Sequence, residues 1–137
     1  MPGHPLPPPE ILARLRAIAR ALPETYEESA WVGLRWRVRT HTFAHVFAIA
    51  GGKPQVYATA AGTDGPAVAM TFRSRIAELD RTHFTEPPFF RPLWPADMAA
   101  IFLDETVDWD DVAGLLEGSY RVQAPRKLVA RLEAARR

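Results

Sequence analysis

The sequence has no cysteine, and this absence excludes several kinds of chemistry. Without a thiol, the chain can form no disulfide, no thiolate nucleophile and no cysteine-ligated zinc or iron–sulfur site. The sequence also lacks the glycine-rich phosphate-binding motifs of nucleotide enzymes, the Gly-x-Ser-x-Gly motif and the His-Glu-x-x-His motif. Because no nucleophile, acid–base pair or metal cluster is apparent, we expect a non-enzymatic protein with no catalytic residues, no metal site and no cofactor.

The chain also lacks an excess of one charge and any long apolar run. Lysine and arginine number 17 and aspartate and glutamate number 16, which gives a formal net charge of +1. The whole chain therefore exerts little attraction on nucleic acid or on an anionic membrane, and binding to either would need a local patch. No uncharged run approaches the ~18 apolar residues of a membrane span. We expect a cytoplasmic protein without a membrane partner.

Length and composition indicate one domain. The 137 residues are 47% hydrophobic, enough to bury one core but too few for two ordinary domains. Residues 1–9 contain five of the thirteen prolines, so we expect an extended or disordered leader there. The single domain should then occupy residues 10–137.

The hydrophobic pattern predicts a mixture of strands and helices. Alternating residues and turn signals indicate strands at short intervals, and such close spacing favours antiparallel pairing because parallel strands need long crossovers. The α+β fold class follows, with an antiparallel sheet of about five strands. The predicted strands are 35–40, 42–50, 55–60, 68–72 and 99–103.

Helical spacing of apolar residues predicts the remaining elements. Asp108 is a good N-cap for a helix that should end near Gly118. Residues 119–123 would then join it to a last helix that begins at Pro125. We expect Tyr120 in this joint to bury its ring and bind the backbone through its hydroxyl. The other predicted helices are 10–22 and 74–82.

The C-terminal third also carries a family resemblance. The residues concerned are Asp108-Trp109, Leu115-Leu116, Ser119-Tyr120, Ala124-Pro125 and Lys127-Leu128. Their pattern resembles the C-terminal signature of the MmcQ/YjbR family, and the similarity extends over most of residues 21–132. The resemblance implies a two-layer sandwich with helices on one face of the sheet, similar to frataxin-like or secretion-chaperone-like folds. It also implies DNA binding, because family members are described as predicted DNA-binding proteins with two wing-like hairpins.

A row of arginines is the strongest local feature for nucleic-acid binding. Residues two apart share one face of a strand, so Arg35, Arg37 and Arg39 would present three guanidinium groups to phosphates. With double-stranded DNA as the expected partner, these three residues are the predicted contacts. The alternative is an ordinary solvated face, on which the arginines pair with nearby carboxylates, namely Glu24, Glu27 and Glu28.

A second basic strip lies near the C-terminus. Lys127 and Arg131 are four residues apart and share a helical face, so they would add two further phosphate contacts. Alternatively, this basic segment balances the acidic residues of 104–117. A metal role for those acidic residues, suggested by the frataxin-like analogy, is less favoured because they lack the calcium-loop pattern. His41 and His45 are not a predicted ligand pair, since four residues of a strand span about 13 Å.

The aromatic, proline-rich residues 89–94 support an alternative function. Phe89, Phe90 and Trp94 could stack on bases or hold a ligand, although such loops more often cover one end of a core. The alternative to DNA binding is therefore a module that binds a protein or a small molecule. It would use either the sheet face or this loop.

Overall fold

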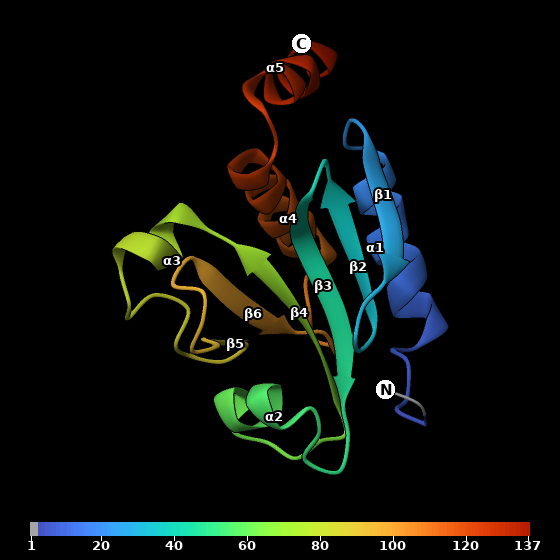
Figure 1. Cartoon of the computed structure of the whole chain (residues 1–137), viewed down its shortest axis with the longest axis vertical. Helices are drawn as coiled ribbons and strands as arrows, with labels where there is room; N and C mark the ends of the chain where they lie inside the picture. Colours follow the sequence, from blue (N-terminus) through green and yellow to red (C-terminus); the bar gives the residue numbers. More distant parts are fainter. Residues whose placement is uncertain (1–2) are drawn as a thin grey trace.

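The structure is a computed structural model that describes residues 3–137, and these residues form five helices and one six-stranded antiparallel sheet (Figure 1). The strand order is β1-β2-β3-β4-β6-β5. The predicted α+β class is confirmed, with six strands rather than about five. The elements in chain order are α1 (Pro9–Arg20), β1 (Thr25–Ser29), β2 (Leu34–Val38), β3 (His41–Ile49), α2 (Gln55–Ala61), β4 (Ala67–Arg73), α3 (Arg75–Leu79), β5 (Phe89–Phe90), β6 (Met98–Phe102), α4 (Trp109–Gln123) and α5 (Arg126–Ala135).

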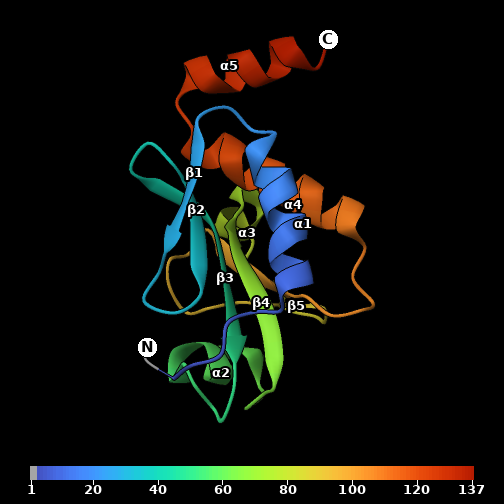
Figure 2. The same cartoon turned by 90° about the vertical axis from the view of Figure 1, so that its right-hand side faces the viewer.

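The main core lies between one face of the sheet and helices α1 and α4, which run along that face (Figure 2). Leu15 of α1 and Leu116 of α4 are fully buried in it. On β2, Trp36 and Val38 are buried in the same cluster. Because side chains alternate along a strand, Arg35 and Arg37 lie on the opposite face, as the sequence pattern predicts.

Residues 55–60 are helical, so the prediction of a strand there is wrong. The helix α2 covers part of the outer face of the sheet, where Ala58 packs with Phe47 and Ile49. Tyr57 stacks on Phe47 with ring centroids 4.1 Å apart. Pro54 precedes the helix, and Gly62 ends it in the left-handed conformation. The helices therefore do not all lie on one face, because α2 occupies the face opposite α1 and α4.

The strands β1 and β5 were not predicted. β1 is the edge strand of the sheet and contains Tyr26, Glu27 and Glu28, which are too polar for a typical half-buried strand. Charged residues are common on edge strands because they discourage pairing with another chain. β5 consists only of Phe89 and Phe90, within the aromatic segment predicted to be a loop.

Helix α4 is longer than predicted, since it continues through Gly118 to Gln123. Ser119 and Tyr120 are fully buried, and their packing outweighs the cost of glycine within a helix. The predicted joint is therefore the last turn of α4. The helix ends before Pro125, because a residue that precedes proline avoids the helical conformation.

The Tyr120 prediction is confirmed: its ring is buried and its hydroxyl donates to the Pro23 carbonyl at 2.8 Å. Ser74 caps α3 by accepting a hydrogen bond from the Ala77 N–H, at the start of the helix predicted over 74–82.

Residues 4–8 of the predicted leader form no helix or strand, α1 begins at Pro9, and the His4 ring lies 2.7 Å from the Ala48 carbonyl. The first two residues of the predicted leader lie outside the described range. Within residues 3–137, every helix is too short or too polar to cross a bilayer.

Candidate functional site

The open part of the outer sheet face contains the predicted arginines. α2 covers only one end of this face, toward the bottom of Figure 1, where it packs on β3, β4 and β6. Arg35 and Arg37 lie beyond the part covered by α2, on β2 between the edge strand β1 and the central strand β3. Their side chains are 36% and 21% exposed. They are therefore accessible, but they lie within a continuous sheet and not on a projecting hairpin.

Both arginines of β2 pair with one carboxylate of β1. Glu28 lies opposite Arg35 in the strand register. Its Oε1 atom contacts the guanidinium groups of Arg35 and of Arg37, the latter at 3.0 Å. Hydrogen bonds from Arg37 and Arg35 hold the pKa of Glu28 below its ordinary value. The pairing that the sequence left open as an alternative thus occurs here.

The second carboxylate, Glu24, forms ion pairs with arginines from distant parts of the chain. Arg39 and Arg131 both form ion pairs with it, the second at 3.1 Å between Nη1 and Oε2. The Arg39 hydrogen bond lowers the pKa of Glu24, and the charges of Arg131 and Lys127 lower it further. The structure therefore brings the two predicted basic strips together at this end of the sheet.

Arg39 is not on the strand face that the sequence pattern predicted. β2 ends at Val38, and Arg39 lies in the turn before β3 with φ of 55°. The row on β2 is consequently Arg35 and Arg37 alone. Glu27 also differs from expectation, because it points to the helical side and pairs with Arg16 of α1 at 2.8 Å.

We call the surface formed by Arg35, Arg37, Arg39, Lys127 and Arg131 the basic strip. The strip follows the β1–β2 edge from Glu28 on β1 to Glu24 in the turn before β1. Tyr26 lies between these carboxylates on β1, and its hydroxyl donates to the Arg39 carbonyl at 2.6 Å. The basic strip thus contains five positively charged side chains near two carboxylates, so its net charge is positive.

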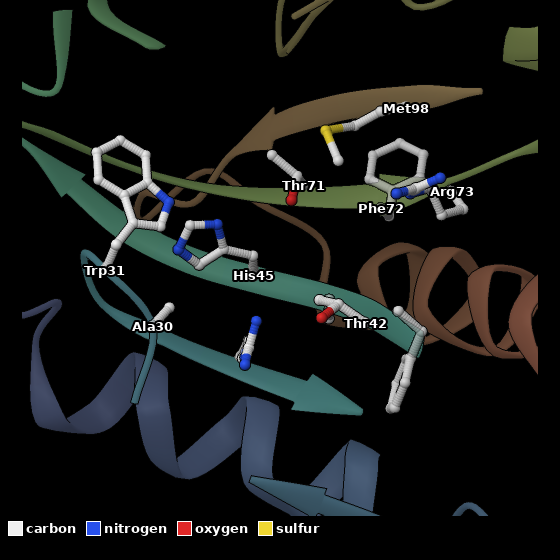
Figure 3. Close-up of a pocket in the computed structure, with 11 residues that line it drawn as sticks. Ala30, Trp31, Thr42, His45, Thr71, Phe72, Arg73 and Met98 are labelled. Carbon is white, nitrogen blue, oxygen red and sulfur yellow. The ribbon is translucent and has the colours of Figure 1, made fainter. Parts of the chain in front are cut away.

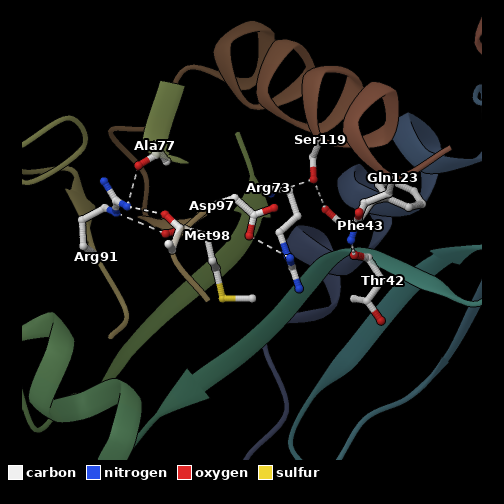
Figure 4. A network of polar contacts seen from close by, with 10 residues as sticks. Thr42, Phe43, Arg73, Ala77, Arg91, Asp97, Met98, Ser119 and Gln123 are labelled. Carbon is white, nitrogen blue, oxygen red and sulfur yellow. Dashed lines mark hydrogen bonds and ion pairs between the residues drawn. The ribbon is translucent and has the colours of Figure 1, made fainter. Parts of the chain in front are cut away.

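A hollow adjoins the basic strip where β3 and β4 separate. The register of the two strands ends at Ala44 and Phe72. At the next position, Ser119 of α4 accepts a hydrogen bond from the Arg73 N–H at 2.8 Å and donates one to the Phe43 carbonyl at 2.6 Å (Figure 4). The serine hydroxyl therefore replaces a direct bond between the strands.

The strands separate further beyond this serine. Gln123 donates to the Thr42 carbonyl at 3.0 Å, also from α4 (Figure 4). Ser119 and Gln123 together hold this end of β3 apart from β4. Ser119 and Tyr120 of the sequence signature both bond to the backbone, and Ser119 shapes the hollow on the other side of the sheet.

The hollow has a volume of about 120 Å³ and is lined by residues of β2, β3, β4 and β6 and of the loop before β2. Arg35, His45 and Thr71 are paired neighbours across β2, β3 and β4. Arg73, two residues after Thr71, lies beside it and pairs with Asp97 at 2.8 Å. Figure 3 shows His45, Thr71 and Arg73 around one opening between β3 and β4. Thr71 and Arg73 were not predicted as site residues, although two polar residues at alternate positions of an apolar strand are a usable signal.

His45 is buried beneath this hollow and is held by the backbone. Its Nε2 lies 2.5 Å from the Val32 carbonyl, and burial lowers the pKa of the imidazole. His41, by contrast, is exposed at the start of β3. Among residues 3–137, no three His, Cys, Asp or Glu side chains are grouped as a metal site would require.

The aromatic segment 89–94 has two distinct parts. Phe90 is buried and Phe89 packs on the core, so these two rings cover one end of the sheet. Trp94 is 80% exposed, and the neighbouring Leu93 is 86% exposed. Arg91 fixes this segment, because its guanidinium donates to the backbone carbonyls of Ala77, Asp80, His83, Ala96 and Met98. Figure 4 shows Arg91 with Ala77 and Met98.

The comparisons with known proteins assign no family. No model of a known protein family matches the chain, and no curated protein matches it either.

Proposed function

We propose that this protein is a non-enzymatic DNA-binding protein of the MmcQ/YjbR type, whose basic strip contacts the phosphates of double-stranded DNA. The observation that carries the proposal is the convergence of five cations, from β2, the following turn and α5, around only two carboxylates. Phosphate contacts of this kind supply most of the affinity in non-specific DNA binding. The sequence resemblance supports the same proposal independently.

The existing ion pairs do not prevent phosphate binding. Pairs this exposed are weak because water and salt screen them. A guanidinium carries five donors, and the ion pair of Arg35 with Glu28 leaves donors that a phosphate oxygen can accept from. Arg35 and Arg37 lie on β2, which is next to the edge strand β1 of the six-stranded sheet. Contact would therefore be made by the edge of the sheet.

Binding to a labelled random duplex at about 50 mM and about 200 mM salt tests the proposal. The test variant replaces Arg35 and Arg37 with alanine. We expect wild-type affinity to fall steeply with salt, and the double variant to bind more weakly with a salt slope shallower by about 2, because two phosphate contacts are lost. The matched control replaces Arg75 and Arg81, two exposed arginines at and after α3, and should keep the wild-type slope.

Two results would contradict the proposal. One is the absence of wild-type binding at the lower salt concentration. The other is an equal loss of affinity in the Arg35/Arg37 variant and in the Arg75/Arg81 control, which would indicate a response to net charge alone.

Contact with a protein partner is the second candidate function, favoured by the exposure of Trp94 and Leu93 on a segment fixed by Arg91. An exposed tryptophan held in a fixed position suits the centre of a protein interface. This candidate predicts binding that is lost when both residues are replaced with serine and that is unchanged in the Arg35/Arg37 variant.

A further inference from the structure

The hollow between β3 and β4 has the donors that an anion requires. Arg35 and Arg73 line it from β2 and β4, on either side of the central strand β3. The carboxylates that pair with these arginines, Glu28 and Asp97, are not among the lining residues. The wall of the hollow therefore contains two cations and no acidic side chain.

Two hydroxyl groups add neutral donors. Thr71 is only 2% exposed. Its hydroxyl has no hydrogen-bond partner among the described residues, and the residue lines the hollow from β4. A ligand oxygen in the hollow could accept a hydrogen bond from this hydroxyl. The Thr42 hydroxyl is likewise unpartnered within residues 3–137 and lines the hollow from β3. Figure 3 shows both threonines beside the same opening.

The size of the hollow limits what it can hold. Its volume of about 120 Å³ exceeds that of one water molecule, about 30 Å³. It is well below the roughly 300 Å³ at which pockets for drug-sized ligands begin. Four donor groups on three strands also suit a tetrahedral group, which presents oxygens in several directions, better than a planar one.

We propose that this hollow binds one phosphate group, held by the guanidinium groups of Arg35 and Arg73 and by the hydroxyl groups of Thr71 and Thr42. The site is separate from the proposed DNA contact, because Arg73, Thr71 and Thr42 lie outside the basic strip. Only Arg35 belongs to both, so the test leaves Arg35 unchanged. Ser119 and Gln123 of α4 create the space by holding the strands apart.

Titration with inorganic phosphate, followed by the backbone amide NMR shifts of the full chain at constant ionic strength, tests the site. We expect saturable shifts at Thr71, Arg73 and His45. Thr71→Val keeps the shape and the strand preference of the residue but removes the hydroxyl, and it should weaken phosphate binding by about tenfold. Arg73→Gln should weaken binding by about tenfold or more, because a charge-assisted hydrogen bond is lost.

Matched controls are available close to both positions. Arg75→Gln removes a charge two residues beyond Arg73, and Thr85→Val removes a hydroxyl from an exposed loop. Neither should change phosphate affinity. Acetate, a planar anion of smaller charge, should bind more weakly than phosphate.

Oligonucleotides distinguish the source of the phosphate. If a 5′-phosphorylated oligonucleotide binds more tightly than inorganic phosphate and its 5′-hydroxyl counterpart shifts Thr71 less, the site takes a nucleic-acid end. If inorganic phosphate binds as tightly, the ligand is free phosphate or a small phosphomonoester. The absence of saturable shifts at Thr71 and Arg73, equal affinity for acetate, or unchanged phosphate affinity in Thr71→Val would overturn the proposal.

Discussion

At the residue scale, Tyr120 contributes one hydrogen bond whose effect on stability can be isolated. Its ring contacts Phe43 edge-on, with centroids 5.7 Å apart, while its hydroxyl donates to the Pro23 carbonyl. Tyr120→Phe keeps the ring and leaves that carbonyl without its donor. We expect a loss of about 1–2 kcal/mol in the free energy of unfolding, measured by urea denaturation.

Tyr26→Phe is the matched control for this prediction. The Tyr26 hydroxyl also donates to a backbone carbonyl, that of Arg39, but Tyr26 is 42% exposed. Water can replace the lost donor at that position, so the expected change is less than about 0.5 kcal/mol. Equal losses in the two variants would show that burial of the Tyr120 hydrogen bond has no particular importance.

At the element scale, the glycines of α4 offer a gain in stability. A Cβ atom at Gly118 would meet no atom within 4 Å, and the position lies within the helix. Gly118→Ala should therefore raise the free energy of unfolding by about 0.5–1 kcal/mol, because alanine loses less backbone entropy on folding. Thermal and urea denaturation of the variant would measure this gain, and a loss of stability would contradict the packing described for α4.

Gly33→Ala, in the turn before β2, should change stability in the opposite direction to Gly118→Ala. This glycine has φ of 69°, and a Cβ atom there would lie 1.9 Å from the Val46 carbonyl oxygen. The backbone must move to accept any side chain, so we expect severe destabilisation or failure to fold. A stable Gly33→Ala variant would mean that this turn does not constrain the approach of β2 to β3.

Several elements could be predicted from local pattern, and the exceptions have physical causes. The alternation at Trp36 and Val38 correctly assigned the two faces of β2. Residues 55–60 alternate in the same manner, but Pro54 before them and Gly62 after them are the signals of a short helix. β1 was missed because an edge strand of this sheet needs few apolar residues. Gly118 predicts a helix end from local pattern alone, because the burial of Ser119 cannot be inferred from the sequence.

At the scale of the whole molecule, the partners of the basic residues could not be predicted. The alternation of Arg35 and Arg37 predicted a shared face, and nearby glutamates were correctly named as possible partners. The approach of Arg131 to Glu24, however, joins residues 107 positions apart. Such a contact depends on how α5 packs against the end of the sheet through Leu128 and Leu132. The hollow likewise depends on α4 separating two strands.

Three glutamates on β1 and in the turn before it form ion pairs with separate parts of the molecule. Glu27 joins α1 through Arg16, Glu28 joins β2, and Glu24 joins the β2–β3 turn to α5. Hydrogen bonds from arginines hold the pKa of each of these carboxyl groups below its ordinary value. Protonation would therefore weaken contacts to α1, β2 and α5 together.

The sign of the pH dependence follows from these lowered pKa values. A carboxyl group whose pKa is lower in the folded state stabilises the fold above the unfolded pKa, about 4.3 for glutamate, and loses that effect as the pH falls through the folded pKa. We expect the free energy of unfolding, measured in urea from about pH 7 to about pH 3, to decrease once the pH drops below this unfolded pKa.

Replacing all three glutamates with glutamine should make this decrease smaller. The same change at Glu78, Glu86 and Glu105, which are exposed and form no ion pair among residues 3–137, should not. Equal acid dependence in both triple variants would mean that these ion pairs do not hold α1, β2 and α5 to the edge of the sheet.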